Sequence, residues 1–262
     1  MKLTLENYFS KKAMFEYMST SQFKAFEKCE AEAIYNLNAD VNVVKDAFTE
    51  GHLFEALIEG GEQEQLFYAQ HPEMISGTGK SKGQLKSNFK KIVGSAEAFK
   101  KQPEFVKIYN RCEKQVILTG VINGVKYKAA VDLIDIENGE IYDTKCMKDF
   151  KKVYSETARC YAPWMYAYGY HYQAAIYLEL AKQMFGKEFT FNLLAVTKEE
   201  NPDVFYGGFT QETVNNALEI IKEFSPLYQD IKNGVAMAER CEHCNYCKES
   251  KIITGPEIIE VW

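Results

Sequence analysis

Alternating apolar and polar positions mark neighbouring segments of the chain as strands. Residues 125–136 and 140–147 alternate with period two, and a third strand-like run covers residues 113–121. Between the first two runs lies Asn138-Gly139, and this dipeptide between alternating segments is a strong signal for a two-residue hairpin turn. Such a turn would place Asp132, Asp143 and Lys145 on one face of an antiparallel pair. The predicted cross-strand pairs are Glu137–Glu140, Ile134–Asp143 and Asp132–Lys145.

The remaining periodicity is mostly helical. Apolar side chains at helical spacing predict helices over residues 19–38, 43–59, 83–101 and 210–232, another helix that ends near residue 185, and a further strand at residues 189–197. Helices, three antiparallel strands, then helix, strand and helix indicate an α/β fold with helices layered around a mixed sheet. No internal repeat or flexible linker interrupts residues 1–262, so we expect a single domain with a cysteine-rich tail at residues 240–250.

Composition adds only broad limits. The chain is 46% hydrophobic and 26% charged, which is typical of a globular protein with a sizeable core. It has no apolar run long enough to cross a membrane, and its first residues lack the features of a secretory signal, so we expect a cytoplasmic location. The net charge of −6 gives no global support for nucleic-acid binding, although a local basic segment can still bind a phosphate backbone.

The acidic hairpin has two interpretations. Two carboxylates can hold Mg²⁺ or Mn²⁺ through oxygen ligands, and the metal can polarise a phosphodiester and activate water. A lysine beside the metal can orient that water and stabilise the charge that develops on phosphorus. The alternative is an ordinary cross-strand salt bridge on a solvated face, because opposite-charge pairs are common between strands.

The order of these residues resembles a known nuclease signature. Asp132 followed by Asp143-Thr144-Lys145 is similar to the D…(D/E)xK pattern of the PD-(D/E)xK nuclease superfamily, and Gln173 and Tyr177 resemble its QxxxY element. The stretches "FEKCEAEAIYN", "EGHLFEALIEGG", "KQVILTG" and "RCEHCNYCKES" are similar to phage-type exonucleases of the RecE (exodeoxyribonuclease VIII) and RecB-like branch. The likeness runs from about residue 19 to 252 and implies a restriction-endonuclease-like core, with a mixed central sheet flanked by helices.

The resemblance also implies roles for individual residues. Asp132 and Asp143 would be metal ligands, the carbonyl of Thr144 would add a ligand, and Lys145 would assist the attacking water. Gln173 and Tyr177 lie four residues apart on one helix face and would contact the DNA backbone or the lysine. Ordinary packing of that helix face is the alternative.

Other candidates surround this set. In the upstream helix Glu55 stands where relatives have a histidine and could bind the metal, although His52 lies one turn away and could be mistaken for the motif residue; a solvated face is the alternative for both. Gln115 could line the site as a neutral group. Lys128 is expected to contact phosphate, and Lys80 and Lys82 belong to a basic segment that could hold a DNA backbone.

Cysteine spacing predicts a second metal site. Cys241, Cys244 and Cys247 form a CxxCxxC run suited to zinc or an iron–sulfur cluster. Cys29 matches the lone N-terminal cysteine that joins three C-terminal ones around a [4Fe–4S] cluster in some RecB-like nucleases, and His243 is an alternative ligand for zinc. The other three cysteines, Cys112, Cys146 and Cys160, are predicted to be buried thiols.

These features lead to one principal functional hypothesis. The chain is expected to be a Mg²⁺- or Mn²⁺-dependent DNA exonuclease that hydrolyses one strand at linear duplex ends. The resemblance implies 5′ to 3′ polarity, a role in phage-type recombination beside a single-strand annealing protein, and assembly into a trimer or tetramer. A non-catalytic DNA-end-binding scaffold and a sequence-specific endonuclease with the same core remain alternatives.

Overall fold

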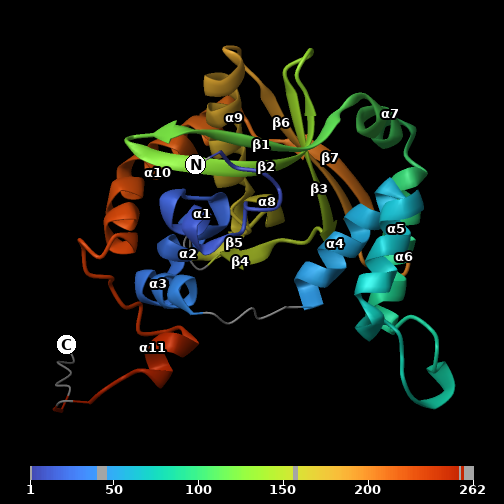
Figure 1. The fold of residues 1–262 in the computed structure, drawn as a ribbon, viewed down its shortest axis with the longest axis horizontal. Coiled ribbons are helices and arrows are strands. Elements are labelled where there is room, and N and C mark those ends of the chain that lie inside the picture. The colour runs from blue at the N-terminus through green and yellow to red at the C-terminus, as the bar shows by residue number, and fades with distance from the viewer. Residues whose placement is uncertain (1, 40–45, 156–158, 254, 257–262) are drawn as a thin grey trace.

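A mixed β-sheet lies at the centre of the computed structural model, which describes residues 2–39, 46–155, 159–253 and 255–256 (Figure 1). The strands are β1 (Glu113–Ile122), β2 (Val125–Asp135), β3 (Glu140–Met147), β6 (Thr190–Thr197) and β7 (Val204–Gly208). They lie in the order β1-β2-β3-β6-β7, and β3 and β6 are parallel while the other neighbours are antiparallel. The parallel pair is joined through helix α9 (Tyr170–Phe185), as a parallel connection requires a crossover.

Helices cover both faces of this sheet. One face packs against α9 and α10 (Gln211–Lys232), with α2 (Thr20–Lys28) beyond them, around a core that includes Tyr127, Ile176 and Leu193. The opposite face packs against α4 (Asp46–Glu59), α6 (Ser87–Lys100) and α7 (Pro103–Arg111) around Phe54, Ile92 and Tyr142. Figure 1 shows these two groups of helices on opposite sides of the strands. The predicted fold class, a restriction-endonuclease-like mixed sheet flanked by helices, is confirmed.

The smaller elements lie at the margins of these layers. A two-stranded ribbon pairs β4 (Val153–Ser155) with β5 (Cys160–Ala162) and leads into a short helix before α9. None of the helices in the described ranges combines the length and the apolar character needed to cross a membrane. The remaining elements are α1 (Lys11–Glu16), α3 (Glu30–Asn38), α5 (Gly61–Gln70), η1 (Pro72–Met74), η2 (Gly79–Ser81), α8 (Trp164–Ala167) and α11 (Asn245–Glu249).

The predicted hairpin register is wrong. The observed pairs are Leu133–Tyr142, Ile134–Ile141 and Asp135–Glu140, so the turn spans residues 136–139 instead of two. Asp135 causes the difference, because its carboxylate accepts hydrogen bonds from the backbone N of Asn138 at 3.0 Å and from its Nδ2 at 2.7 Å. This local side-chain-to-backbone bonding favours a longer turn. The shift changes each partner by two residues, so the alternation of side chains along β3 is preserved.

The predicted helix over residues 19–38 is interrupted. It forms as α2 and α3, which are separated at Cys29, where the backbone is extended with φ −165° and ψ 109°. The predicted helix at residues 43–59 begins in the structure at Asp46, and residues 43–45 lie outside the described residues. The sequence reasoning missed α5, α7 and the edge strand β7, because these elements are short or weakly periodic.

Candidate active site

The two ladders that flank β2 are both interrupted at Asp132. The register of β1 and β2 pairs Lys114 with Leu133 and Val116 with Val131, but it skips Gln115 and Asp132. Gln115 has φ +53°, a left-handed conformation that removes it from strand geometry. On the other side, the pairing of β2 with β3 ends at Leu133–Tyr142. The strands therefore separate at Asp132.

Asp132 fills the opening with its carboxylate. Its Oδ2 accepts a hydrogen bond from the backbone N of Thr144 at 2.9 Å and another from Thr144 Oγ1 at 3.2 Å. The side chain thus takes the place of a missing backbone pair and ties β2 to β3 where the ladder stops. This contact brings Asp132 beside the Asp143-Thr144-Lys145 segment, although the exact partner predicted for it was wrong.

Asp143, which is buried, forms an ion pair with the half-buried Lys145. Asp143 is only 1% exposed, and its Oδ2 lies against the Lys145 ammonium. Burial raises the pKa of the Asp143 carboxyl, an effect that Lys145 opposes and Asp132 reinforces. Burial works against the charge of Lys145, but Asp143 and Asp132 outweigh it and raise the lysine pKa well above its ordinary value. The lysine therefore stays cationic beside two acidic groups.

Gln173 holds Asp143 from the opposite side. Its Nε2 donates a hydrogen bond of 2.6 Å to Asp143 Oδ1, and both side chains are buried. Tyr177, one turn further along α9, donates its hydroxyl to the carbonyl of Ala130 at 3.2 Å. α9 packs both side chains against the sheet, where they position β2 and β3, and their expected contact with the DNA backbone stays a prediction.

Glu55 completes the acidic group from helix α4. It lines a small pocket together with Gln115, Asp132 and Thr144, whereas the exposed His52 is not part of that pocket. Burial, with the repulsion of Asp132, raises the pKa of Glu55 to about 8. Of the two residues considered for the upstream position, Glu55 is the one whose side chain shares a pocket with the predicted metal ligands.

The donor set matches the requirements of a divalent cation. The carboxylates of Asp132 and Asp143 lie close enough to Glu55 that their charges add to burial in raising its pKa, and the carbonyl of Thr144 lies 3.2 Å from Lys145 Nζ. Oxygen ligands of this kind suit Mg²⁺ and Mn²⁺. Asp143 Oδ2 is buried without a hydrogen bond of its own and has only the ion pair with Lys145. A cation would relieve the repulsion that keeps the pKa of Glu55 and Asp143 high.

The predicted DNA-contacting lysines fare differently. Lys128 is 2% exposed, its Nζ donates to the carbonyl of Tyr8, and the ammonium lies 4.3 Å from the Tyr8 ring. The prediction that it contacts phosphate is therefore wrong for this arrangement, because the N-terminal segment covers it. Lys80, in η2, and Lys82, just after it, are exposed, and the segment before α6 that contains η2 lies at the lower right of Figure 1.

Sequence reasoning missed two neighbours of Lys145. The Lys145 ammonium lies 5.8 Å from the centre of the Tyr170 ring, and the Lys24 ammonium lies 5.6 Å from the same ring. Burial lowers the pKa of Lys24, and the nearby charge of Lys145 contributes to this shift. Lys24 belongs to α2, more than a hundred residues away in the sequence, so no local motif could associate it with the hairpin.

The four cysteines of the predicted second site also converge. Their Sγ atoms, from Cys29, Cys241, Cys244 and Cys247, all lie within 4.8 Å of one another. The imidazole of His243 is not part of this group, and the residue is exposed. Of the predicted buried thiols, Cys112 is buried and Cys146 half-buried, but Cys160 is exposed at the edge ribbon, so that prediction is wrong for Cys160.

Comparisons with known proteins agree with this geometry. A family model described as a PDDEXK-like domain of unknown function (DUF3799) matches residues 19–250. The crystal structure of a protein from Eubacterium rectale described as a "putative exonuclease" superposes with a TM-score of 0.87 and 29% sequence identity, covering 98% of this chain and 97% of that one. No curated protein matches the chain.

Proposed function

Since the chain belongs to this family of PDDEXK-like domains, we propose that it is a metal-dependent exonuclease that hydrolyses phosphodiester bonds at the ends of linear double-stranded DNA. One observation carries the proposal: Asp132, Asp143 and Lys145 come together with the carbonyl of Thr144 where β2 and β3 separate. The likeness to the E. rectale protein supports the choice of a nuclease.

Each residue of the site has a chemical task. A divalent cation held by Asp132, Asp143, Glu55 and the Thr144 carbonyl would polarise the phosphodiester and lower the pKa of bound water. Lys145, released from its ion pair with Asp143, can donate to the attacking water and to the charged oxygens that develop on phosphorus. Gln173 keeps the Asp143 carboxylate in one orientation through its 2.6 Å hydrogen bond.

Glu55 couples cation binding to proton release. Its raised pKa of about 8 means that the metal-free carboxyl keeps its proton near neutral pH. A carboxyl must lose this proton to act as a ligand, so cation affinity should rise as the pH is raised from neutrality through that value. Lys80 and Lys82 are the exposed basic residues that we propose to hold the DNA backbone outside the site.

The finer parts of the proposal rest on the sequence resemblance. We propose 5′ to 3′ digestion that leaves a single strand for an annealing protein in phage-type recombination. We also propose that a trimer or tetramer of the chain encircles its substrate. The exonuclease and endonuclease alternatives share the same chemistry, and they differ only in whether a DNA end is needed.

The decisive experiment uses a linear duplex with labelled ends and a closed circle of the same sequence. With Mg²⁺ or Mn²⁺ the protein should degrade the linear DNA and spare the circle, and Asp143→Asn should abolish cleavage while DNA binding persists. Asp230→Asn, a matched change at an exposed position on α10, should retain full activity. Cleavage of the circle would indicate an endonuclease, and cleavage by Asp143→Asn in the presence of EDTA would exclude the assigned site.

A further inference from the structure

The four cysteines join parts of the chain that are distant in sequence. Cys29 lies at the junction of α2 and α3, and its partners lie in the tail, with Cys247 standing 218 positions away. The sulfur–sulfur distances are 3.6 Å for Cys29–Cys247, 3.8 Å for Cys29–Cys244 and 4.0 Å for Cys241–Cys247. Cys29 and Cys247 are buried, and the other two are half-buried.

These distances discriminate between a single ion and a cluster. Zinc binds thiolate sulfur at about 2.3 Å, and four ligands at the corners of a tetrahedron are then about 3.8 Å apart. In a [4Fe–4S] cluster each thiolate binds a different iron on the outside of a cube, so the four sulfurs must lie considerably farther apart. Three of the six sulfur–sulfur separations are 3.6–4.0 Å and all six are within 4.8 Å, which matches the tetrahedron around one ion.

The backbone around the cysteines is arranged to support negatively charged sulfur. Cys241 Sγ accepts hydrogen bonds from the backbone N of His243 at 3.4 Å and of Cys244 at 3.3 Å. Cys244 Sγ accepts one from the backbone N of Cys247 at 3.4 Å, and Cys29 Sγ accepts one from Glu32 at 3.5 Å. Amide donors of this kind stabilise thiolates and fix their orientation, as the outer contacts of metal sites do.

A metal site at these cysteines also explains why the helix predicted over residues 19–38 is interrupted at Cys29. Apolar spacing favours a continuous helix over residues 19–38, yet Cys29 adopts extended backbone angles and acts as the last cap of α2 and the first cap of α3. The change of direction turns the Cys29 sulfur toward the tail. A break that opposes the local helical pattern is explained if the sulfur is required as a ligand.

We propose that Cys29, Cys241, Cys244 and Cys247 hold one zinc ion in a tetrahedral four-thiolate site that clasps the tail to the junction of α2 and α3, in place of an iron–sulfur cluster. Zinc in such a closed site is structural, because no coordination position remains for substrate. The proposal is independent of the nuclease assignment, since none of its ligands belongs to the carboxylate site.

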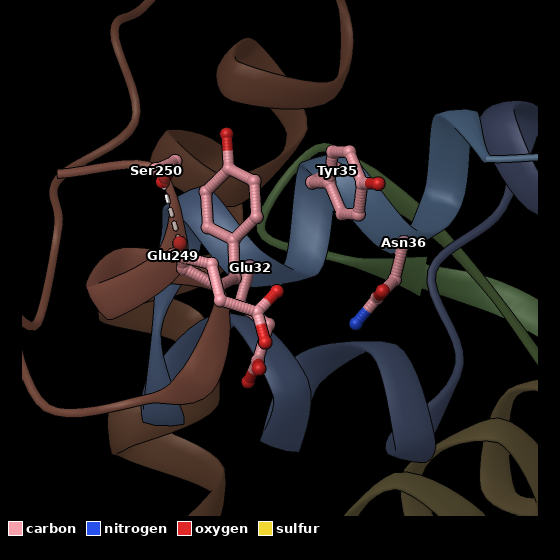
Figure 2. A pocket seen from close by; sticks show the side chains of 6 residues that line it. Glu32, Tyr35, Asn36, Glu249 and Ser250 are labelled. Atoms are coloured by element: carbon pink, nitrogen blue, oxygen red, sulfur yellow. Dashed lines mark hydrogen bonds between the residues drawn. The ribbon is translucent and has the colours of Figure 1, made fainter.

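Contacts around the four sulfurs show what the clasp holds together. The backbone N of Ala31 donates to the carbonyl of Glu239 at 3.0 Å, and the rings of Tyr35 and Tyr246 stack with centres 4.5 Å apart. Figure 2 shows the open side of this seam, where Glu32 and Tyr35 of α3 face Glu249 and Ser250. Because the joined residues are so distant in sequence, the clasp removes much of the freedom of the unfolded chain.

The test measures the metal directly. The full-length protein, produced with both iron and zinc in the medium and purified without oxygen, should be colourless and contain about one zinc per chain bound by thiolates. Cobalt exchanged into the site should give the visible absorption of tetrahedral thiolate coordination. Cys244→Ser should lose the zinc and melt roughly 5–10 °C lower, as expected for the loss of a structural metal in a chain of this size.

Two control variants make the test specific. Cys160→Ser removes an exposed thiol outside the group and should keep both the zinc and the melting temperature. Asp143→Asn alters the carboxylate site and should also keep the zinc, which separates failure of this proposal from failure of the nuclease assignment. A brown protein with several irons and sulfide per chain would overturn the proposal, as would zinc retained by Cys244→Ser or absent from the parent.

Discussion

The hydrogen bond between Gln173 and Asp143 permits a quantitative prediction. Replacing Gln173 with Leu removes the 2.6 Å bond to Asp143 Oδ1 but keeps a side chain of similar size in the buried face of α9. Hydrogen bonds to charged groups contribute about 1.5–3 kcal/mol, which corresponds to a change of about 10- to 150-fold in an equilibrium constant. We expect this loss to appear in the affinity for the divalent cation, because Asp143 is then less firmly oriented and less readily ionised.

The assay is a titration of Mn²⁺ against the rate of degradation of a linear duplex, accompanied by calorimetric titration of Mn²⁺. Gln173→Leu should need about 10- to 150-fold more Mn²⁺ for half-maximal activity and should recover most of the parent rate at saturation. Tyr177→Phe is the matched control, since it removes only the 3.2 Å bond to the Ala130 carbonyl from the same helix. Its Mn²⁺ requirement should change little.

One outcome would refute this reasoning. If Gln173→Leu bound Mn²⁺ as tightly as the parent but stayed inactive at every metal concentration, the side chain would act on DNA and not on the carboxylate. Unchanged activity and unchanged binding would show that the bond to Asp143 contributes nothing to the site. Melting temperatures of both variants should be compared first, so that a loss of folding is not mistaken for a loss of metal affinity.

Two further predictions concern stability. Lys232 is buried, with its ammonium donating to Tyr17 O at 2.9 Å and Gln22 Oε1 at 3.2 Å, and burial lowers its pKa to about 7. At pH values between this pKa and that of a free lysine, the unfolded chain binds more protons than the folded chain, so the free energy of unfolding rises with pH. The cost of burying Lys232 falls from about 4 kcal/mol at pH 7 to about 2 kcal/mol at pH 9. In urea unfolding, the parent should therefore become about 2 kcal/mol more stable between pH 7 and pH 9, and Lys232→Met should lack this gain. An equal change of stability with pH in the two proteins would contradict the burial cost. Gly139→Ala should destabilise the fold by about 1–3 kcal/mol in the same assay, because positive φ strains the new side chain. Gly139 has φ +70°, and its added Cβ would lie 2.8 Å from the Glu188 carbonyl; an unchanged midpoint would show that the turn relaxes freely.

Much of the architecture was predictable because it depends on local pattern. The three strands of the hairpin region, the crossover into residues 189–197 and the last long helix all follow from period-two or helical spacing. Asp132 and the segment from Asp143 to Lys145 lie together, as predicted, although the predicted register was wrong. An error of two residues leaves the alternation of side chains intact, so the segment from Asp143 to Lys145 still lies beside Asp132.

Other features depended on contacts that no local pattern contains. The carboxylate of Asp135 lengthened the turn, and Gly139 lies against the Glu188 carbonyl, so the hairpin was set partly by a segment some fifty residues away. Lys128 has the spacing of a site residue, but the N-terminal segment covers it. Lys24 reaches the surroundings of Lys145 only because α2 packs against α9.

By itself the sequence determined the types of most elements, the acidic residues with their lysine, and the cysteine spacing of the tail, because periodicity, turn chemistry and ligand chemistry act over a few residues. Only the tertiary structure decided the opening at Asp132 and the hydrogen bond from Gln173, and it decided between the alternatives for Glu55 and for Cys29, which the family resemblance implied but no local pattern required. The physical reason is that these contacts join distant segments, and their free energy depends on burial and packing that exist only once the layers have assembled.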